Sequence, residues 1–164
     1  AEAAQGEVVS AVNFNSPGQV VIAGAKAAVE RAIEGCKARG AKRALPLPVS
    51  VPSHCELMRP AAERFAESIA AINWQAPQIP LVQNVSAAVA ADLDTLKRDL
   101  LEQLYKPVRW VESVQTLAAN GATELVECGP GKVLAGLNKR CADGVSTSNL
   151  NTPDAFAAAR AALA

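Results

Sequence analysis

The sequence predicts an α/β fold in which two architectures meet near Pro52. From about residue 56 onward, short apolar runs typical of buried strands alternate with segments whose apolar residues recur every three or four positions, a pattern that favours parallel strands covered by helices. The first fifty residues differ, because they predict a hairpin, a helix and a single strand. Alanine supplies 34 of the 164 residues and buries little area, so we expect an alanine-rich helical layer.

The hairpin is predicted by two β-branched runs, residues 8–13 and 19–23, which flank a Pro-Gly turn signal. Residues 26–39 follow with apolar side chains at helical spacing, and Gly40 stands where a C-terminal cap is expected. Residues 42–47 are the predicted strand. Prolines at 46, 48 and 52 then favour an extended, stiff passage, which marks a boundary between the two architectures.

Five helices and two strands are predicted after this boundary. The helix 56–72 has Ala62, Phe65, Ile69 and Ile72 on one face and ends before an Ala-Pro pair. Leucines at helical spacing predict a second helix at 93–104, and the four residues 103–106 form a corner before the next one. The remaining predicted elements are a buried strand at 79–85, a helix at 108–120 with Pro107 in its first turn, a strand at 124–127, a helix at 132–141 and a last helix from 152.

Composition excludes several classes of function. Sixteen Lys plus Arg balance sixteen Asp plus Glu, so the chain has no field of one sign to attract nucleic acid or an anionic membrane. The longest run without charge contains two prolines and five Asn or Gln residues, which argues against a membrane-spanning helix. The four cysteines have neither C-x-x-C spacing nor a histidine at ligand spacing, so we expect no metal, free buried thiols and a reducing cytoplasm. The sequence begins without Met or a signal segment, and we expect a fragment.

Two places in the sequence could carry chemistry. The strand, glycine loop and helix at 127–134 have the shape of a phosphate site, but the loop lacks the Walker and dinucleotide spacings, so a plain tight turn is favoured. His54, the single histidine, follows the proline-rich passage and could act as a general base or activate a nucleophile, with an inert histidine as the equal alternative. Cys55 should point away from it. No G-x-S-x-G elbow is present to supply a serine.

Four segments in order along the chain resemble the family of bacterial malonyl-CoA:acyl carrier protein transacylases: V-N-F-N-S-P-G-Q-V-V-I-A-G from residue 12, L-P-L-P-V-S-V-P-S-H from 45, Q-L-Y-K-P-V from 103 and G-P-G-K-V-L from 129. The resemblance covers about the C-terminal half of such an enzyme. It implies an α/β-hydrolase-like large subdomain with an inserted ferredoxin-like small subdomain. Residues 1–55 would then be the C-terminal portion of the small subdomain, and 56–164 that of the large one.

The resemblance also implies roles for particular residues. His54 matches the catalytic base, and Gln103 matches the residue whose main-chain carbonyl orients the imidazole, as the Asp does in a Ser-His-Asp triad. Asn13 and Asn15 match positions at the mouth of the substrate cleft, and Ser53 precedes the histidine as in malonyl-selective members. The serine elbow, the arginine that would pair with the malonyl carboxylate and the oxyanion donors of the family are absent from this sequence.

By the same resemblance, the expected reaction is transfer of a malonyl group from malonyl-CoA to the phosphopantetheine thiol of acyl carrier protein through an acyl-serine. The coenzyme A thioester is a substrate, and no cofactor is expected. Expected partners are acyl carrier protein, malonyl-CoA and the N-terminal half of the same enzyme, and the chain alone should be inactive. The densest basic cluster could dock the acidic carrier protein, although a solvated helix end is at least as good an interpretation; it comprises Lys37, Arg39, Lys42 and Arg43. The alternatives are a non-catalytic fragment that binds carrier protein and, less favoured, a small nucleotide-binding protein.

Overall fold

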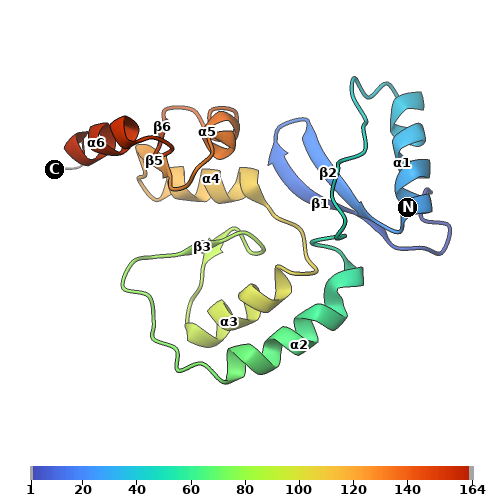
Figure 1. The fold of residues 1–164 in the computed structure, drawn as a ribbon, viewed down its shortest axis with the longest axis horizontal. Coiled ribbons are helices and arrows are strands. Elements are labelled where there is room, and N and C mark those ends of the chain that lie inside the picture. Colours follow the sequence, from blue (N-terminus) through green and yellow to red (C-terminus); the bar gives the residue numbers. More distant parts are fainter. Residues whose placement is uncertain (1, 163–164) are drawn as a thin grey trace.

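A β-hairpin begins the fold in the computed structural model, which describes residues 2–162. Strand β1 (Val9–Ser16) pairs antiparallel with β2 (Gln19–Gly24), and helix α1 (Lys26–Ala38) follows them (Figure 1). Pro17 and Gly18 form the two-residue turn, and Gly18 has φ +77°, a value that glycine adopts without strain. The predicted hairpin and helix are therefore confirmed, although β1 runs three residues further than expected.

The hairpin and α1 join at a position that only glycine fits. Gly24 has φ +156°, and a Cβ built on it would lie 2.1 Å from the carbonyl oxygen of Val8. The next amide, of Ala25, donates to that same oxygen at 2.8 Å. At the other end of α1, Gly40 has φ +86° and its N–H donates to the carbonyl of Lys37 at 3.0 Å, as expected of a C-terminal cap.

Residues 41–55 form an irregular passage with no helix or strand, so the predicted strand at 42–47 is wrong. Pro46 and Pro48 have no N–H to donate to a ladder. Leu45 and Leu47 are 57% and 54% exposed, so the apolar run that predicted the strand is not buried among the described residues. Two short-range hydrogen bonds bend this passage locally, from the N–H of Val49 to Leu47 at 2.8 Å and from the N–H of Ser53 to Val51 at 2.9 Å.

Helices α2 and α3 pack against each other below the hairpin in Figure 1. A short 3₁₀ turn, η1 (Glu56–Met58), leads into α2 (Arg59–Ala70), and α3 (Leu93–Glu102) is capped by Asp92, whose carboxylate accepts from the N–H of Thr95 at 2.7 Å. This hydrogen bond lowers the pKa of Asp92. Of the predicted apolar face of 56–72, Ala62 and Ile69 are buried, whereas Phe65 and Ile72 are exposed.

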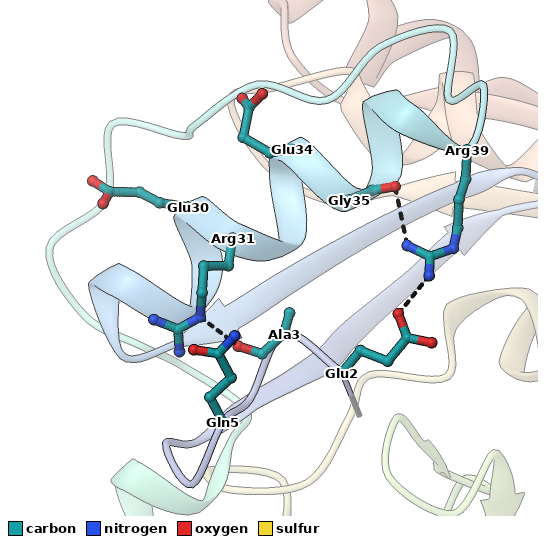
Figure 2. Close-up of a pocket in the computed structure, with 8 residues that line it drawn as sticks. All are labelled: Glu2, Ala3, Gln5, Glu30, Arg31, Glu34, Gly35 and Arg39. Atoms are coloured by element: carbon teal, nitrogen blue, oxygen red, sulfur yellow. Dashed lines mark hydrogen bonds and ion pairs between the residues drawn. The ribbon is translucent and has the colours of Figure 1, made fainter.

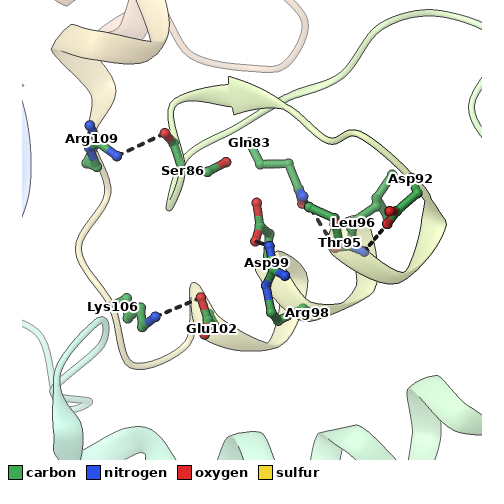
Figure 3. Close-up of polar contacts among 10 residues, drawn as sticks. All are labelled: Gln83, Ser86, Asp92, Thr95, Leu96, Arg98, Asp99, Glu102, Lys106 and Arg109. Carbon is green, nitrogen blue, oxygen red and sulfur yellow. Dashed lines mark hydrogen bonds and ion pairs between the residues drawn. The ribbon is translucent and has the colours of Figure 1, made fainter.

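The predicted buried strand at 79–85 is largely wrong. Only β3 (Val82–Gln83) forms there, and it pairs antiparallel with β4 (Ala88–Val89). Ile79 is 79% exposed, so the apolar residues of this run do not enter a core among the described residues. Gln83 is buried instead, and its side-chain amide donates to the carbonyl of Leu96 in α3 at 3.3 Å (Figure 3).

The C-terminal part contains a parallel strand pair. After α4 (Trp110–Ala119), β5 (Glu124–Glu127) pairs parallel with β6 (Ser146–Asn149), and α5 (Val133–Asn138) connects the two strands. The parallel arrangement confirms the α/β prediction; β6 was not predicted. Helix α5 is shorter than expected, α6 (Pro153–Ala162) forms as expected, and α4 begins three residues after Pro107, which is therefore not in its first turn.

The most completely buried large side chains are Val12 of β1, Val114 of α4 and Cys55 just before η1. Two of these residues belong to elements that pack against each other, β1 and α4. All four cysteines are free, but Cys36 and Cys128 are exposed, so the expectation of buried thiols holds only for Cys55 and Cys141. Burial raises the pKa of the Cys141 thiol. Among residues 2–162, no helix is both long and apolar enough to cross a membrane.

Candidate active site

The connection from α3 to α4 is a tight corner that leaves two carbonyl groups available. The N–H of Gln103 still donates to Asp99 at 3.0 Å, and the N–H of Lys106 donates to Glu102 at 2.8 Å. An ion pair of 2.8 Å between the side chains of Lys106 and Glu102 closes the corner (Figure 3). Because the last carbonyls of a helix have no intrahelical partners, those of Gln103 and Leu104 can accept hydrogen bonds from elsewhere.

His54 makes both of these hydrogen bonds. Its backbone N–H donates to the carbonyl of Leu104 at 2.9 Å, and its ring Nδ1 lies 2.5 Å from the carbonyl oxygen of Gln103. The residue has φ +65°, in the left-handed region that a side chain rarely adopts. Such a conformation persists where its surroundings hold it, and residues held in this way cluster at active sites, ligand clamps and switch regions. The imidazole is half-buried.

The contact with Gln103 determines the tautomer of His54. A backbone carbonyl can only accept a hydrogen bond, so Nδ1 must carry the hydrogen. In the neutral ring the lone pair is then on Nε2, which can take up a proton from an incoming group. The acceptor carries no full negative charge, so it orients the ring without placing a carboxylate beside it. The geometry is that of a general base with a main-chain orienting partner.

Neither neighbour of His54 makes a side-chain hydrogen bond to the imidazole among the described residues. Cys55 is buried, and its thiol donates to the carbonyl of Pro52 at 3.1 Å, so the sulfur is engaged with the backbone rather than the imidazole. Ser53 is exposed, and its backbone N–H donates to Val51 at 2.9 Å. Within residues 2–162, no group of three or more His, Cys, Asp and Glu side chains is placed to hold a metal ion.

Asn13 and Asn15 lie on β1, which is attached to the corner by its backbone. The N–H of Phe14 donates to Val108 at 2.9 Å, and the N–H of Val108 donates to Val12 at 2.8 Å. Both asparagines are half-buried. Among the described residues, no hydrogen bond joins either asparagine or Ser53 to His54, so hydrogen bonding links only His54 and Gln103 of the five predicted site residues.

The glycine loop before α5 is not arranged to bind an anion. The carboxylate of Glu127 accepts from the N–H of Ala135 at 2.8 Å and so already occupies the start of this helix. A phosphate group there would be repelled by that carboxylate. The helix is also only six residues long. These observations favour the tight turn that the sequence indicated over a nucleotide site.

Sequence reasoning missed several residues that hold the corner in place. Arg109 precedes α4, and its guanidinium donates to the carbonyl of Ser86 at 2.9 Å (Figure 3). The same guanidinium pairs with Glu112. The hydrogen bond from Arg109 lowers the pKa of Glu112. On the other side, the guanidinium of Arg59 lies 4.1 Å from the ring centroid of Tyr105. Tyr105 lies in the Q-L-Y-K-P-V segment, but no local signal indicates its partner in α2.

A hollow of about 500 Å³ lies away from this site, between α1 and the first residues of the chain (Figure 2). Two arginines on its wall are already paired: Arg39 with Glu2 at 2.5 Å, and Arg31 with the carbonyl of Ala3 at 2.9 Å. Arg31 also pairs with Glu7 at 2.6 Å. The role of these side chains is therefore structural, since they hold the N-terminal segment against α1.

Comparison with known proteins matches residues 1–155 to the acyl transferase domain family. The chain is 59% identical over 158 residues to the malonyl CoA-acyl carrier protein transacylase of Escherichia coli K12, a match that covers 96% of this chain and 51% of that protein. The Bacillus subtilis protein of the same name is 45% identical over 150 residues, covering 92% and 47%. The chain therefore spans about half the length of the curated relatives it matches.

Solved structures agree with this result. The crystal structure of the malonyl-CoA:acyl carrier protein transacylase of Xanthomonas oryzae pv. oryzae superposes with a TM-score of 0.95 at 50% identity, covering 98% of this chain and 51% of that one. A malonyl-transacylase solved in complex with a type II polyketide acyl-carrier protein has a TM-score of 0.93 at 51% identity, covering 96% and 51%. Structural neighbours of this kind have an α/β-hydrolase-like fold, in agreement with the predicted fold class.

Proposed function

Because this chain belongs to the acyl transferase domain family, we propose that it forms part of an acyltransferase that moves a malonyl group from malonyl-CoA to the phosphopantetheine thiol of acyl carrier protein. The observation that carries the proposal is the 2.5 Å contact between His54 Nδ1 and the carbonyl of Gln103. It leaves Nε2 as the basic atom of the site. In this reaction His54 is the catalytic base, and Gln103 orients it.

The proposed reaction has two halves. In the first, Nε2 of His54 takes the proton of a serine hydroxyl as its oxygen attacks the thioester carbonyl, and returns it to the departing coenzyme A thiolate. In the second, Nε2 takes the proton of the incoming phosphopantetheine thiol, whose sulfur attacks the acyl-serine, and the serine oxygen recovers the proton on leaving. The coenzyme A thioester is a substrate, and no other cofactor is required.

The serine is not in this sequence, which contains no G-x-S-x-G string. We propose that it comes from the N-terminal half of the same enzyme, together with the oxyanion donors and an arginine for the malonyl carboxylate. The match of this chain to only about half of each relative supports this division. The 164 residues alone should then be inactive, and the cytoplasm, where the four thiols would stay reduced, is the proposed location.

The domain boundary and the substrate contacts are also part of the proposal. Residues 1–55 would belong to a ferredoxin-like small subdomain and 56–164 to the large one; residues 1, 163 and 164 lie outside those the structure describes. The irregular passage 41–55 supports a boundary there. Asn13, Asn15 and Ser53 are the proposed substrate-binding residues. The backbone pairing of β1 with Val108 supports this, because it joins the strand that carries both asparagines to the same α3–α4 connection whose carbonyls hold His54.

Docking of acyl carrier protein is proposed at the basic cluster Lys37, Arg39, Lys42 and Arg43. Two of the four are already in ion pairs, Lys37 with Glu34 at 2.8 Å and Arg39 with Glu2 at 2.5 Å, so Lys42 and Arg43, both exposed, would carry most of the attraction. Exchange of all four for alanine should raise KM for the carrier protein and leave KM for malonyl-CoA unchanged. Equal changes in the two constants would contradict this docking role.

A chimera tests the proposed function. In it, this chain replaces the segment of the Escherichia coli relative that it matches, so that the serine half is supplied by a protein 59% identical over the exchanged region. The chimera should transfer malonyl to acyl carrier protein, while the chain alone should not. His54→Ala should lower kcat by about 10²- to 10⁴-fold, as loss of a general base does, whereas exposed Ser50→Ala should leave kcat unchanged.

The second candidate function is a non-catalytic fragment that binds carrier protein. It predicts carrier-protein binding by the chain with no transfer by a folded chimera. Full activity of the His54→Ala chimera would also contradict the proposed role of His54. Turnover by the unmodified chain alone would contradict the division of the site between two halves.

A further inference from the structure

We propose that Arg59 and Tyr105 are positioning residues that hold His54 on the Gln103 carbonyl. This inference rests on the proposed role of His54 as the base. It concerns two side chains that make no hydrogen bond to the imidazole among the described residues and that act through the backbone segments that hold it. The observation behind it is the position of the Arg59 guanidinium, 4.1 Å from the centroid of the Tyr105 ring.

The two residues close a loop of contacts around the site. Arg59 is five residues beyond His54 along the chain, and Tyr105 is two residues beyond Gln103 in the corner. The near end of the loop is closed by the hydrogen bonds of His54 to Gln103 and Leu104. The far end is closed by the stacking of Arg59 on Tyr105. Each closure limits how far the start of α2 can move away from the corner.

The guanidinium of Arg59 is also held by a second partner, Glu56. Its Nε and Nη2 donate to the two carboxylate oxygens of Glu56 at 2.7 and 2.9 Å, a bidentate pair one helical turn back. This pairing raises the pKa of Arg59 and lowers that of Glu56, so both remain charged. Because the N–H groups that bind the carboxylate lie in the guanidinium plane, the flat face of the cation remains available to stack on the aromatic ring.

His54 has a conformation that needs such support. Its φ of +65° is unfavourable for any residue with a Cβ, so the local chain would relax if its ends were released. The turn that contains it is closed by the buried thiol of Cys55, which donates to the carbonyl of Pro52 at 3.1 Å. After Cys55 the chain enters η1 and α2, where Arg59 makes the contact to the corner. Release of that contact should favour opening of the His54–Gln103 hydrogen bond.

The readout is the rate at which the Nδ1 proton of His54 exchanges with water, measured by NMR on the 164-residue chain. The chain has a single histidine, so the signal is unambiguous. Exchange requires the hydrogen bond to Gln103 to open. Loss of an exposed cation–π contact should raise the open population, and therefore the exchange rate, by about 2- to 5-fold. Because this experiment needs no substrate, its result is independent of whether the proposed acyl transfer is correct.

Matched variants separate positioning from general stability. Tyr105→Leu removes the ring and should raise the rate, whereas Tyr105→Phe keeps the ring and should not. Arg59→Gln should raise the exchange rate to the same extent. The double variant that combines it with Tyr105→Leu should raise the rate no further, since the two changes remove the same contact. Arg31→Gln removes an arginine that pairs with Glu7 far from the site, and should leave the rate unchanged.

The exposed Arg59→Gln keeps the test valid if Tyr105→Leu fails to fold. Equal rates for Arg59→Gln and the unmodified chain would overturn the proposal. So would an increase with Arg31→Gln as large as with Arg59→Gln, because the effect would then reflect global stability. The chimera could instead lack transfer activity while the variants change the exchange rate as expected. That outcome would count against the proposed function and leave the positioning role standing.

Discussion

The left-handed conformation of His54 has a measurable cost in stability. With φ at +65°, a Cβ at position 54 should destabilise the fold by about 1–2 kcal/mol relative to a residue without one. Glycine in turn loses about 0.4–1 kcal/mol because its unfolded chain is more flexible. The difference predicts that His54→Gly is more stable than His54→Ala by about 0.8 kcal/mol from the middle of the two ranges, and by about 1.6 kcal/mol at most, since both variants lack the imidazole and its hydrogen bond.

The same pair of substitutions in a helix provides the control. Glu63 is exposed in the middle of α2, where alanine should be more stable than glycine by about 1 kcal/mol. The sign of the Gly-minus-Ala difference should therefore reverse between positions 54 and 63. Urea unfolding followed by circular dichroism gives the four free energies of unfolding by linear extrapolation. If alanine is more stable than glycine at both positions, His54 does not have the conformation on which the site depends.

Three other predictions follow from the described contacts. Gly24→Ala should lower the free energy of unfolding by well over 1 kcal/mol, because its Cβ would lie 2.1 Å from a backbone oxygen. The Cβ of the control variant Gly136→Ala meets nothing within 4 Å, so this change should be neutral or stabilising, and equal melting temperatures for the two variants would refute the prediction. Alkylation should modify Cys36 and Cys128 in the native chain and all four cysteines in urea; fast labelling of Cys141, whose thiol pKa is raised by burial, would contradict its placement. Folding lowers the pKa of Asp92, so its stabilising effect is present above the pKa it has in the unfolded chain and is lost as the pH falls through the lowered value. Asp92→Asn should therefore reduce the loss of stability in acid. An unchanged acid unfolding profile would argue against the cap.

The sequence predicted those elements whose apolar side chains recur at helical spacing. Helices α1, α2 and α3 and the hairpin lie within a few residues of their predicted bounds. The strand predicted at 42–47 did not form, because an apolar run indicates burial without showing that a partner strand is present. The missed strand β6 has the sequence Ser-Thr-Ser-Asn, which has no apolar alternation, and it is held by pairing with β5. Pattern alone cannot reveal a strand that depends on such a long-range partner.

The site shows the same division between local and long-range information. The proline-rich passage indicated that His54 was held without a helix or a sheet, but nothing in its neighbourhood predicts a carbonyl partner 49 residues away. That pairing came only from the resemblance of the Q-L-Y-K-P-V segment to a known family. The left-handed φ of His54 and the Arg59–Tyr105 contact had no signal in the sequence, since both depend on how α2 meets the corner.

The tautomer of His54 in the unmodified chain tests the central claim most directly. Nitrogen-15 NMR distinguishes a ring nitrogen that carries hydrogen from one with a free lone pair, and the only imidazole signals belong to this residue. If the carbonyl of Gln103 accepts from Nδ1, the neutral ring should have its hydrogen on Nδ1 and the lone pair on Nε2. A neutral ring with its hydrogen mainly on Nε2 would contradict the contact and, with it, the proposed base.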